Sequence, residues 1–308
     1  MVKQEMEQTI LYNHLVKELE LFFKEVGFEK AVIGISGGID SAVVAALSVA
    51  ALGKENVTGI FMPASHTSQE SSKLAKDLAQ SLNITLKTMN IRHMEQYFVE
   101  ECASSFREDW NPIPNVAEEN IQARLRMVTL YAYANKNNCL VVNTSNMTEA
   151  LLGYGTMYGD VTGSISPLGR VGKLMVYRLA NYINRKKLII PQEIIDRQPT
   201  AELSDGQTDE GSLGSTYAIL DPLTAYVFYE MAYSNASFIT SSGSFNPDMT
   251  EIDDKYGKIF PSVVAMEAVV RMKKNAFKML QCPPPIVLPE NLKWWEMYPE
   301  FHAEFKAK

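Results

Sequence analysis

The sequence of 308 residues lacks several features that would place it in a specialised class of protein. No apolar run approaches the roughly 18 residues that a membrane-spanning helix needs. The three cysteines, Cys102, Cys139 and Cys282, are too scattered for a CxxC zinc or redox pair and indicate reduced thiols. The start of the chain is charged and amphipathic, without the apolar core of a signal peptide, so we expect a cytoplasmic protein.

Basic charge is also scarce. The formal net charge is −7, whereas a general nucleic-acid binder needs a basic face to displace phosphate counterions. We therefore expect no nucleic-acid partner and no membrane partner, although a nucleotide ligand needs only a few local cations. The hydrophobic fraction of 46% is enough to bury a sheet, and the length favours one α/β domain over 1–308, with a C-terminal tail at 283–308.

Short apolar runs alternate with helical patterns along the first half of the chain. We expect strands at 31–35, 57–62, 84–89 and 139–142, and helices at 39–52, 71–82, 94–106 and 117–137. This alternation predicts a doubly wound parallel sheet with helices on both faces. Ligands bind at the carboxyl ends of the strands in such sheets, so the loops after residues 35, 62 and 142 should surround one crevice.

The remaining segments are expected to flank this core. An amphipathic helix at 3–26 should pack on the body, or else pair with a second subunit. The glycines of 153–163 are too frequent for a regular element. A helix should begin near Lys173, and a polar, acidic lid at 204–211 should precede an apolar helix at 213–233. A Ser/Asn/Gly-rich loop at 234–247 and a last helix at 261–280 complete the prediction.

The turn Ser36–Ser41, with the sequence Ser-Gly-Gly-Ile-Asp-Ser, lies between the first expected strand and helix. Free N–H groups and the positive end of the helix dipole make such a turn an anion site, and its glycines let phosphate oxygens approach the main chain. A Walker loop would add a lysine at the helix start, but Asp40-Ser41 stands here. A carboxylate beside a phosphate needs a cation between them, so Asp40 predicts Mg²⁺. The simpler alternative is a glycine turn with Asp40 in the first helical turn.

Two further polar positions allow both a structural and a functional interpretation. The run 143–149 follows the fourth expected strand, and its Asn and Thr residues followed by Glu149 read as a helix cap. On the rim of a crevice, the same residues can hold nucleotide hydroxyls and a metal. Lys173 lies near a helix N-terminus, where a basic side chain opposes the dipole. It therefore indicates a partner anion, unless it is simply solvated.

The turn at Ser36–Ser41 resembles the pyrophosphate loop of the ATP pyrophosphatases, which cleave ATP between the α- and β-phosphates to adenylate a substrate. Over about 18–285 the chain resembles NAD⁺ synthetase. Four blocks carry the resemblance, in the order and spacing of that family: SGGIDS at 36–41, NIQARLRM at 120–127, NTSNMTEALLGYGTMYGD at 143–160 and PTAEL at 199–203.

The resemblance implies that the chain amidates deamido-NAD⁺ to NAD⁺. In the family, the nicotinate carboxylate attacks the α-phosphorus of ATP, pyrophosphate leaves, and ammonia displaces AMP. The resemblance implies ATP, deamido-NAD⁺ and ammonia as small-molecule partners, Mg²⁺ as cofactor and a homodimer. The implied catalytic residues are Asp40, Lys173 and Asp160. The implied ATP-binding residues are Gly34, Ser36, Gly37, Gly38, Asp40, Ser41, Thr144, Lys173 and Thr200. Arg124, Asp160 and Lys278 are expected at the dinucleotide, and Asp40 and Glu149 at Mg²⁺.

The source of nitrogen is a separate question. Met157, Ser164 and Phe277 stand where the compact bacterial ammonia-dependent enzymes carry lysine, aspartate and histidine, and this pattern is more like the synthetase half of larger glutamine-dependent enzymes. Only 35 residues precede the phosphate loop, so we expect no amidase domain in this chain and ammonia as the direct nucleophile. Supply of ammonia by a separate amidase subunit stays open.

Two other classes of function compete with this interpretation. One is another adenylating pyrophosphatase, acting on a purine nucleotide or a tRNA base; a tRNA-thiolating enzyme should show catalytic cysteines and a basic face. The other is a nucleotide sensor without activity. Release of AMP from ATP, Mg²⁺, ammonium and deamido-NAD⁺ would separate them. An enzyme must also shield its acyl-adenylate from water, so we expect 63–72 and 203–214 to close over it.

Overall fold

A four-stranded parallel sheet forms the centre of the fold. The computed structural model describes residues 2–106, 116–204, 206–232, 262–293 and 297–298. The strands are β1 (Ala31–Gly34), β2 (Val57–Phe61), β3 (Thr85–Thr88) and β4 (Leu140–Val141), in the order β3-β2-β1-β4. Every pairing is parallel, and Ala31 of β1 stands opposite Val57 on one side and Leu140 on the other.

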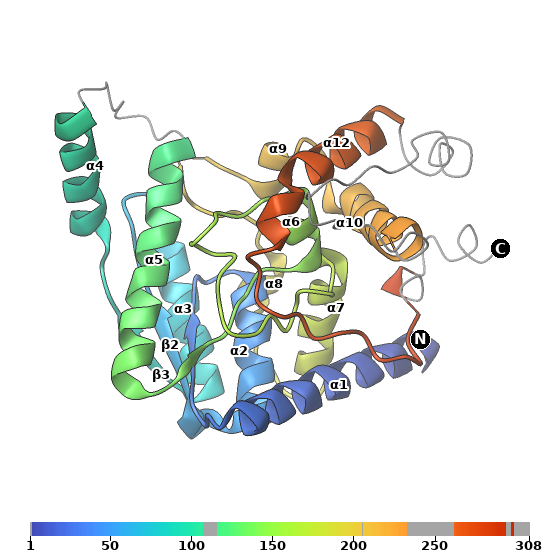
Figure 1. Cartoon of the computed structure of the whole chain (residues 1–308). Coiled ribbons are helices and arrows are strands. Elements are labelled where there is room, and N and C mark those ends of the chain that lie inside the picture. The colour runs from blue at the N-terminus through green and yellow to red at the C-terminus, as the bar shows by residue number, and fades with distance from the viewer. Residues whose placement is uncertain (1, 107–115, 205, 233–261, 294–296, 299–308) are drawn as a thin grey trace.

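Helices cover both faces of this sheet, which confirms the doubly wound architecture (Figure 1). On one face α2 (Ile39–Leu52) and α3 (Gln69–Leu82) pack on the strands. On the other face lies α5 (Val116–Asn137), with α4 (Arg92–Phe106) beside it. Successive residues of β1 serve the two faces: Val32 packs in the hydrophobic cluster that includes α5, and Ile33 in the larger cluster that includes α2.

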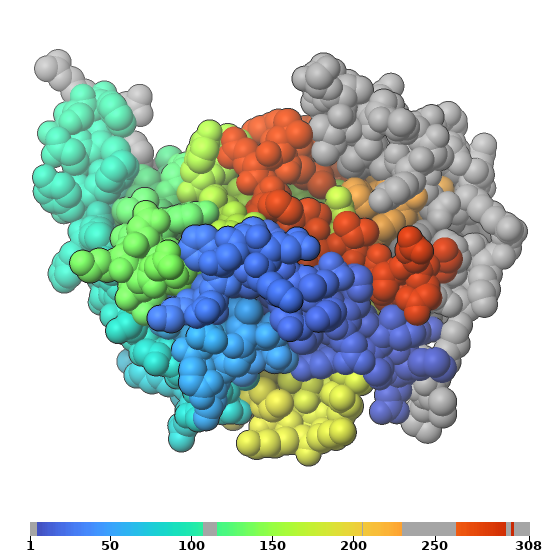
Figure 2. All heavy atoms as spheres, turned by 60° about the horizontal axis from the view of Figure 1, so that its bottom comes forward, coloured from blue at the N-terminus to red at the C-terminus, as the bar shows by residue number. Residues whose placement is uncertain are grey.

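The N-terminal helix α1 (Val2–Val26) packs across α2 and α7 (Lys173–Asn184). It buries Leu11, Leu15 and Leu19 completely, so its apolar face is used within the chain, as the packing interpretation predicted. Figure 2 shows α1 in dark blue across one face, with the C-terminal segment in red beside it. His14 Nε2 on α1 lies 2.7 Å from the carbonyl oxygen of Val287 in that segment.

Helix boundaries follow the local sequence closely, with one exception. The expected 39–52 helix is found with those bounds, and Gly53 ends it at φ +81°. The prediction of one helix over 213–233 was wrong. Gly214 adopts φ +80° and ends α9 (Asp209–Leu213), and α10 (Tyr217–Tyr226) begins after Thr216 and continues as a π-helix over Val227–Ala232. Glycine accepts this left-handed conformation readily, so the chain breaks there.

The other helical elements are short or lie near the C-terminus: η1 (Lys54–Asn56), α6 (Met147–Leu152), α8 (Gln192–Asp196) and α12 (Ser262–Met279). The 153–163 segment has neither helix nor strand, as its glycines predicted. The loop expected at 234–247 and residues 299–308 of the expected tail lie outside the described residues. None of the helices in the described ranges is both long and apolar enough to cross a membrane.

Candidate active site

The loop between β1 and α2 is folded by its own serines. Ser41 Oγ donates to the carbonyl of Gly38 at 2.9 Å and accepts from the N–H of Ser36 at 3.3 Å. Ser36 Oγ accepts from the N–H of Gly38 at 3.1 Å. Gly38 is the N-cap of α2 and brings no capping side chain, so the first-turn N–H groups are available to an anion. Gly37 holds φ +86°, and a Cβ there would lie 2.7 Å from the carbonyl oxygen of Ser71.

This loop forms one wall of a cavity of about 480 Å³ at the carboxyl end of the sheet. Most of the residues that the sequence predicted for the site line this cavity: Gly34, Ser36, Gly38, Asp40, Ser41, Thr144, Glu149, Asp160, Lys173, Thr200 and Lys278. Gly37 and Arg124 are not among its described lining residues. Arg124 is exposed on α5, where its Nε donates to the carbonyl of Met157 at 3.2 Å.

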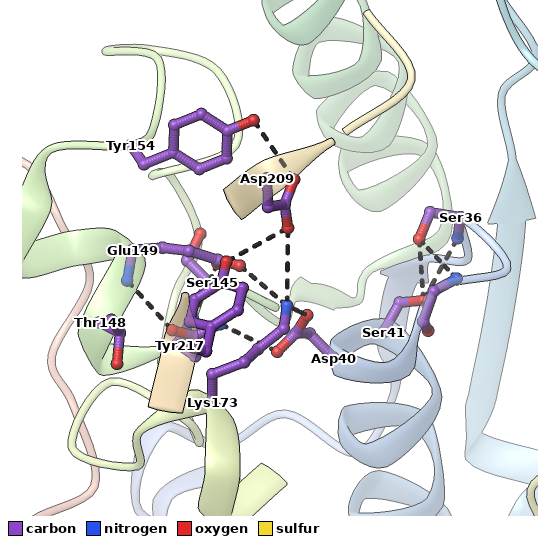
Figure 3. Close-up of polar contacts among 12 residues, drawn as sticks. Ser36, Asp40, Ser41, Ser145, Thr148, Glu149, Tyr154, Lys173, Asp209 and Tyr217 are labelled. Carbon is purple, nitrogen blue, oxygen red and sulfur yellow. Dashed lines mark hydrogen bonds and ion pairs between the residues drawn. The ribbon is translucent and has the colours of Figure 1, made fainter. Parts of the chain in front are cut away.

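Lys173 lies at the centre of the charged part of the site (Figure 3). Its side chain is 2% exposed, and its Nζ lies 2.6 Å from Asp40 Oδ2 and 3.2 Å from Glu149 Oε1. Asp209 Oδ2 is 3.9 Å away. The three carboxylates come from α2, α6 and α9, so this one ammonium joins elements that are distant in sequence. The sequence predicted an anionic partner for Lys173, and the partners in the structure are carboxylates of the chain itself.

The charges of this cluster do not balance. Three carboxylates surround one ammonium, so the fully ionised cluster would hold two negative charges in excess in a buried place. Burial raises the pKa of Glu149 to about 8; the attraction of Lys173 opposes this rise, and the repulsion of Asp40 and Asp209 adds to it. Burial alone would lower the pKa of Lys173, but the three carboxylates hold it well above its usual value. The cluster therefore keeps Lys173 charged and favours a further cation.

Glu149 has a structural and an electrostatic role at once. Asn146 is the N-cap of α6, and its side chain accepts from the N–H of Glu149 while Glu149 Oε2 accepts from the N–H of Asn146. This is the capping box expected from the sequence. The other carboxylate oxygen of Glu149 faces Lys173, and Asn146 Nδ2 donates to Asp40 Oδ1 at 3.0 Å. The cap interpretation of this segment is confirmed, whereas a metal or nucleotide hydroxyl at these residues stays a prediction. Asn146 also joins the first turn of α2 to the start of α6.

Asp209 is the carboxylate that sequence reasoning missed. The sequence around it reads as a solvated acidic lid, yet Asp209 is 4% exposed. The hydroxyls of Tyr154 and Tyr217 each donate to it at 3.2 Å, and the ring of Tyr217 lies 5.1 Å from Lys173 Nζ. Burial and the neighbouring carboxylates raise the pKa of both tyrosines, so both remain protonated donors. No local pattern in the sequence marks Asp209 as buried; only the fold shows it.

The glycine-rich segment 153–163 forms a second wall. Lys278 of α12 donates from Nζ to the carbonyls of Gly153 and Gly155 at 2.8 and 2.9 Å, which fixes this segment to α12. Asp160 is exposed to the cavity, but the walls around it restrict water. This enclosure raises the pKa of Asp160, against the lowering effect of the Thr156 N–H at 2.9 Å. Lys278 also has its pKa lowered by burial.

The third wall joins the two segments expected to act as lids. Glu202 accepts from Arg197 Nη2 at 2.6 Å and from Ser71 Oγ at 2.8 Å, and it holds the left-handed φ of +49°. Thr200 Oγ1 donates to the carbonyl of Gln207 at 2.6 Å. The PTAEL block is therefore hydrogen-bonded to the start of α3, directly behind the phosphate loop. Whether 63–72 and 203–214 open and close stays a prediction.

The three positions that depart from the ammonia-dependent pattern lie outside the described lining of the cavity. Ser164 continues the sheet, because its N–H donates to the carbonyl of Val141 at 2.8 Å. Phe277 is 49% exposed on α12, one residue before Lys278. Met157 contributes its carbonyl to Arg124. None of these three positions contacts the charged cluster around Lys173.

Comparison with known proteins agrees with this geometry. The sequence profile of the NAD synthase family matches residues 11–258. The chain belongs to the NAD synthase family. This is a family of ATP-using carbon–nitrogen ligases, and the family match extends over all the elements that carry the charged cluster.

The relatives include proteins of two kinds. An NH₃-dependent NAD⁺ synthetase of Fusobacterium nucleatum is 40% identical over 245 residues, which are 78% of this chain and 87% of that protein. A glutamine-dependent NAD⁺ synthetase of Aquifex aeolicus is 35% identical over 298 residues, which are 94% of this chain and 48% of that protein. The chain thus spans about half the length of the Aquifex protein.

Two solved structures are similar in fold. An NMN synthetase from Francisella tularensis superposes with a TM-score of 0.67 and 28% identity, and the match covers 88% of this chain and 95% of that one. A glutamine-dependent NAD⁺ synthetase from Acinetobacter baumannii, solved in complex with ADP, gives a TM-score of 0.58 and 29% identity, and the match covers 88% and 45%.

Proposed function

We propose that this chain amidates the nicotinate carboxylate of deamido-NAD⁺ to NAD⁺, using ATP and ammonia and releasing AMP and pyrophosphate. The observation that carries the proposal is the position of Lys173. Its buried ammonium lies between Asp40 and Glu149, beside a phosphate loop that has no lysine of its own. A loop that activates the α-phosphorus of ATP needs this cation at the pyrophosphate that leaves.

In the first step, ATP lies with its phosphates in the Ser36–Ser41 loop. A carboxylate oxygen of the substrate forms a bond to the α-phosphorus, the bond from that phosphorus to the bridging oxygen breaks, and pyrophosphate leaves with the electron pair. Negative charge grows on the pyrophosphate oxygens in the transition state. Lys173 and the first-turn N–H groups of α2 offset this charge, and their fixed positions avoid the cost of reorganisation.

The residues present fit Mg²⁺. Asp40 and Glu149 offer carboxylate oxygens beside the phosphate loop, and the cluster when fully ionised carries two negative charges in excess. Among the described residues, no group of three His, Cys, Asp or Glu side chains is placed to hold a metal alone. Mg²⁺ is commonly bound by one or two carboxylates together with substrate phosphates, which matches this donor set. When bound, Mg²⁺ would neutralise charge on the phosphate oxygens.

In the second step, ammonia attacks the acyl carbon of the adenylate. The carbon–nitrogen bond forms, the carbon–oxygen bond to AMP breaks, and the nitrogen loses one proton. Asp160 faces the cavity with a raised pKa, and we assign it the acceptance of this proton. Arg124 and Lys278 remain proposed contacts of the dinucleotide, and Thr144 and Thr200 proposed contacts of ATP. The proposed homodimer is tested by sedimentation of the purified chain.

A second candidate keeps the chemistry and changes the source of nitrogen. The alignment to the Aquifex glutamine-dependent enzyme covers 94% of this chain, so the chain could act as a synthetase that receives ammonia from an amidase. The alignment to the Fusobacterium ammonia-dependent enzyme covers 87% of that protein and supports direct use of ammonia.

One experiment tests which acceptor and which nitrogen donor the purified chain uses on its own. The purified chain is supplied with ATP and Mg²⁺, with either deamido-NAD⁺ or nicotinate mononucleotide as acceptor, and with either ammonium chloride or glutamine as donor. We expect NAD⁺ from deamido-NAD⁺ and ammonium, and little product from glutamine. Equal NAD⁺ formation from glutamine would overturn the direct use of ammonia, and faster amidation of the mononucleotide would overturn the dinucleotide substrate.

A further inference from the structure

One buried carboxylate takes no part in the charged cluster yet touches two of the elements that carry it. Asp221 of α10 is completely buried. Its Oδ1 accepts from the N–H of Lys173 at 2.7 Å, and its Oδ2 accepts from the N–H of Leu174 at 2.9 Å. Gly172, the N-cap of α7, brings no capping side chain. Asp221 therefore caps α7 from another helix.

The same carboxylate holds the start of α6. The hydroxyl of Thr148, itself completely buried, donates to Asp221 Oδ1, and Thr148 directly precedes Glu149. Gly172 makes this approach possible, because a Cβ there would lie 2.4 Å from Asp221 Oδ1. A single carboxylate thus accepts hydrogen bonds from the backbone of Lys173 and from Thr148, the residue next to Glu149.

This arrangement resolves an electrostatic conflict in α7. A lysine at the first position of a helix opposes the positive end of the dipole, and the unpaired first-turn N–H groups need acceptors. Asp221 supplies both acceptors, and its carboxyl group faces the positive end of the dipole. The backbone of Lys173 is then fixed, and its side chain extends from that point to Asp40 and Glu149.

We propose that Asp221 is a positioning residue for the reaction. Its hydrogen bonds to the first residues of α7 and to Thr148 of α6 hold Lys173 and Glu149 in fixed positions relative to each other. The inference rests on the function proposed above. Charge on the leaving pyrophosphate is greatest in the transition state, so a misplaced Lys173 costs more in kcat than in ATP binding.

Four variants test this role. Asp221→Asn keeps the shape and puts an amide N–H₂ where an acceptor is needed. Thr148→Val removes the hydroxyl that reaches Asp221, and Thr148→Ser keeps it. Thr224→Val is the matched control: Thr224 is also completely buried, and its hydroxyl donates to the main-chain carbonyl of Asp221 at 2.9 Å, away from the carboxylate.

For each variant, kcat, the KM for ATP, the thermal midpoint and amide exchange at Lys173 and Leu174 are measured. We expect Asp221→Asn and Thr148→Val to lower kcat by about 10- to 100-fold with a smaller change in KM. Thr148→Ser should recover most of the loss. Thr224→Val should lower the midpoint as Thr148→Val does but leave kcat near the wild-type value.

The proposal is overturned if kcat follows the thermal midpoint across all four variants, or if Thr148→Val keeps the wild-type kcat. Amide exchange separates this failure from failure of the proposed function. If the wild-type chain forms no AMP from deamido-NAD⁺, the proposed function fails, while faster exchange at Lys173 and Leu174 in Asp221→Asn still supports the positioning contact. Unchanged exchange in a folded Asp221→Asn overturns it.

Discussion

At the scale of single residues, the site is defined by an imbalance of charge around Lys173. A buried ion pair is often no more stabilising than apolar packing, and an unbalanced cluster is costly. Asp40, Glu149 and Asp209 share one ammonium, so the cluster without ligands stores repulsion that a cation among phosphates would relieve. This is the pattern expected where stability is given up for function.

Glu149→Gln tests that imbalance through pH. The pKa of Glu149 is raised from 4.5 to about 8 in the folded chain. Because the folded chain binds this proton more tightly than the unfolded chain, the contribution of Glu149 to the free energy of unfolding is greatest below about pH 4.5 and is lost as the pH rises through about 8. Glutamine keeps the capping box with Asn146. Without divalent cations, the thermal midpoint of Glu149→Gln should exceed that of the wild type by about 2 °C or more at pH 8.5, with little difference at pH 5. An equal difference in the thermal midpoint at both pH values would contradict this account. We also expect Glu149→Gln to lose turnover.

Asp40→Asn removes one charge from the cluster and little from the core, because its side chain is 18% exposed. We expect turnover to fall by about 100-fold or more while the circular dichroism spectrum stays that of the wild type. Asp77→Asn is the control, since the side chain of Asp77 on α3 is 40% exposed and pairs with Lys73 at 3.1 Å, outside the cavity. Near-normal AMP release by Asp40→Asn under saturating Mg²⁺ would show that Asp40 is no metal ligand.

At the scale of elements, the phosphate loop depends on its contact with α3. Gly37→Ala would place a Cβ 2.7 Å from the carbonyl oxygen of Ser71 at φ +86°, so we expect a loss of about 1–3 kcal/mol in the free energy of unfolding. Gly38→Ala is the control in the same loop, where the nearest atom to a Cβ is Ser36 Oγ at 3.2 Å. Urea unfolding measures both. Equal losses would mean that the contact with Ser71 does not constrain the loop.

The two segments expected to close over the site should respond to substrates. Ser71 at the start of α3 and Glu202 are hydrogen-bonded at 2.8 Å, so 63–72 and 203–214 should move together. Hydrogen exchange in both should slow when ATP, Mg²⁺ and deamido-NAD⁺ are all present, and residues 9–19 of α1 serve as an unchanged reference. Exchange that is the same with and without substrates would contradict the lid assignment.

These elements also show what sequence alone could predict. Helix α2 was found with its predicted bounds, because an apolar strand, a glycine turn and Gly53 mark its ends locally. The acidic segment around Asp209 was predicted to be solvated, because no pattern in the sequence indicates that the hydroxyls of Tyr154 and Tyr217 will donate to this carboxylate. Asp221 was missed for the same reason, since its partners Lys173 and Thr148 lie on other helices. Hydrophobic periodicity and turn residues are local features of the sequence, whereas clusters of charge form only when distant segments meet in the folded chain.

At the scale of the whole molecule, the fold brings one loop and three carboxylates to a single cavity at the carboxyl end of a parallel sheet. The described lining of the cavity includes the basic residues Arg126, Lys173, Arg197, Arg271 and Lys278 as well as the carboxylates of the charged cluster. The net charge of −7 therefore does not exclude an anionic substrate, because local cations and the N-terminus of α2 can meet its phosphates.

The central claim is that this cavity cleaves ATP between the α- and β-phosphates to activate a carboxylate for amidation. The most direct measurement is the product balance when the purified chain receives ATP, Mg²⁺, deamido-NAD⁺ and ammonium chloride. The account predicts AMP, pyrophosphate and NAD⁺ in equal amounts, and no AMP when deamido-NAD⁺ is left out. ADP and inorganic phosphate formed in proportion to NAD⁺ would contradict it.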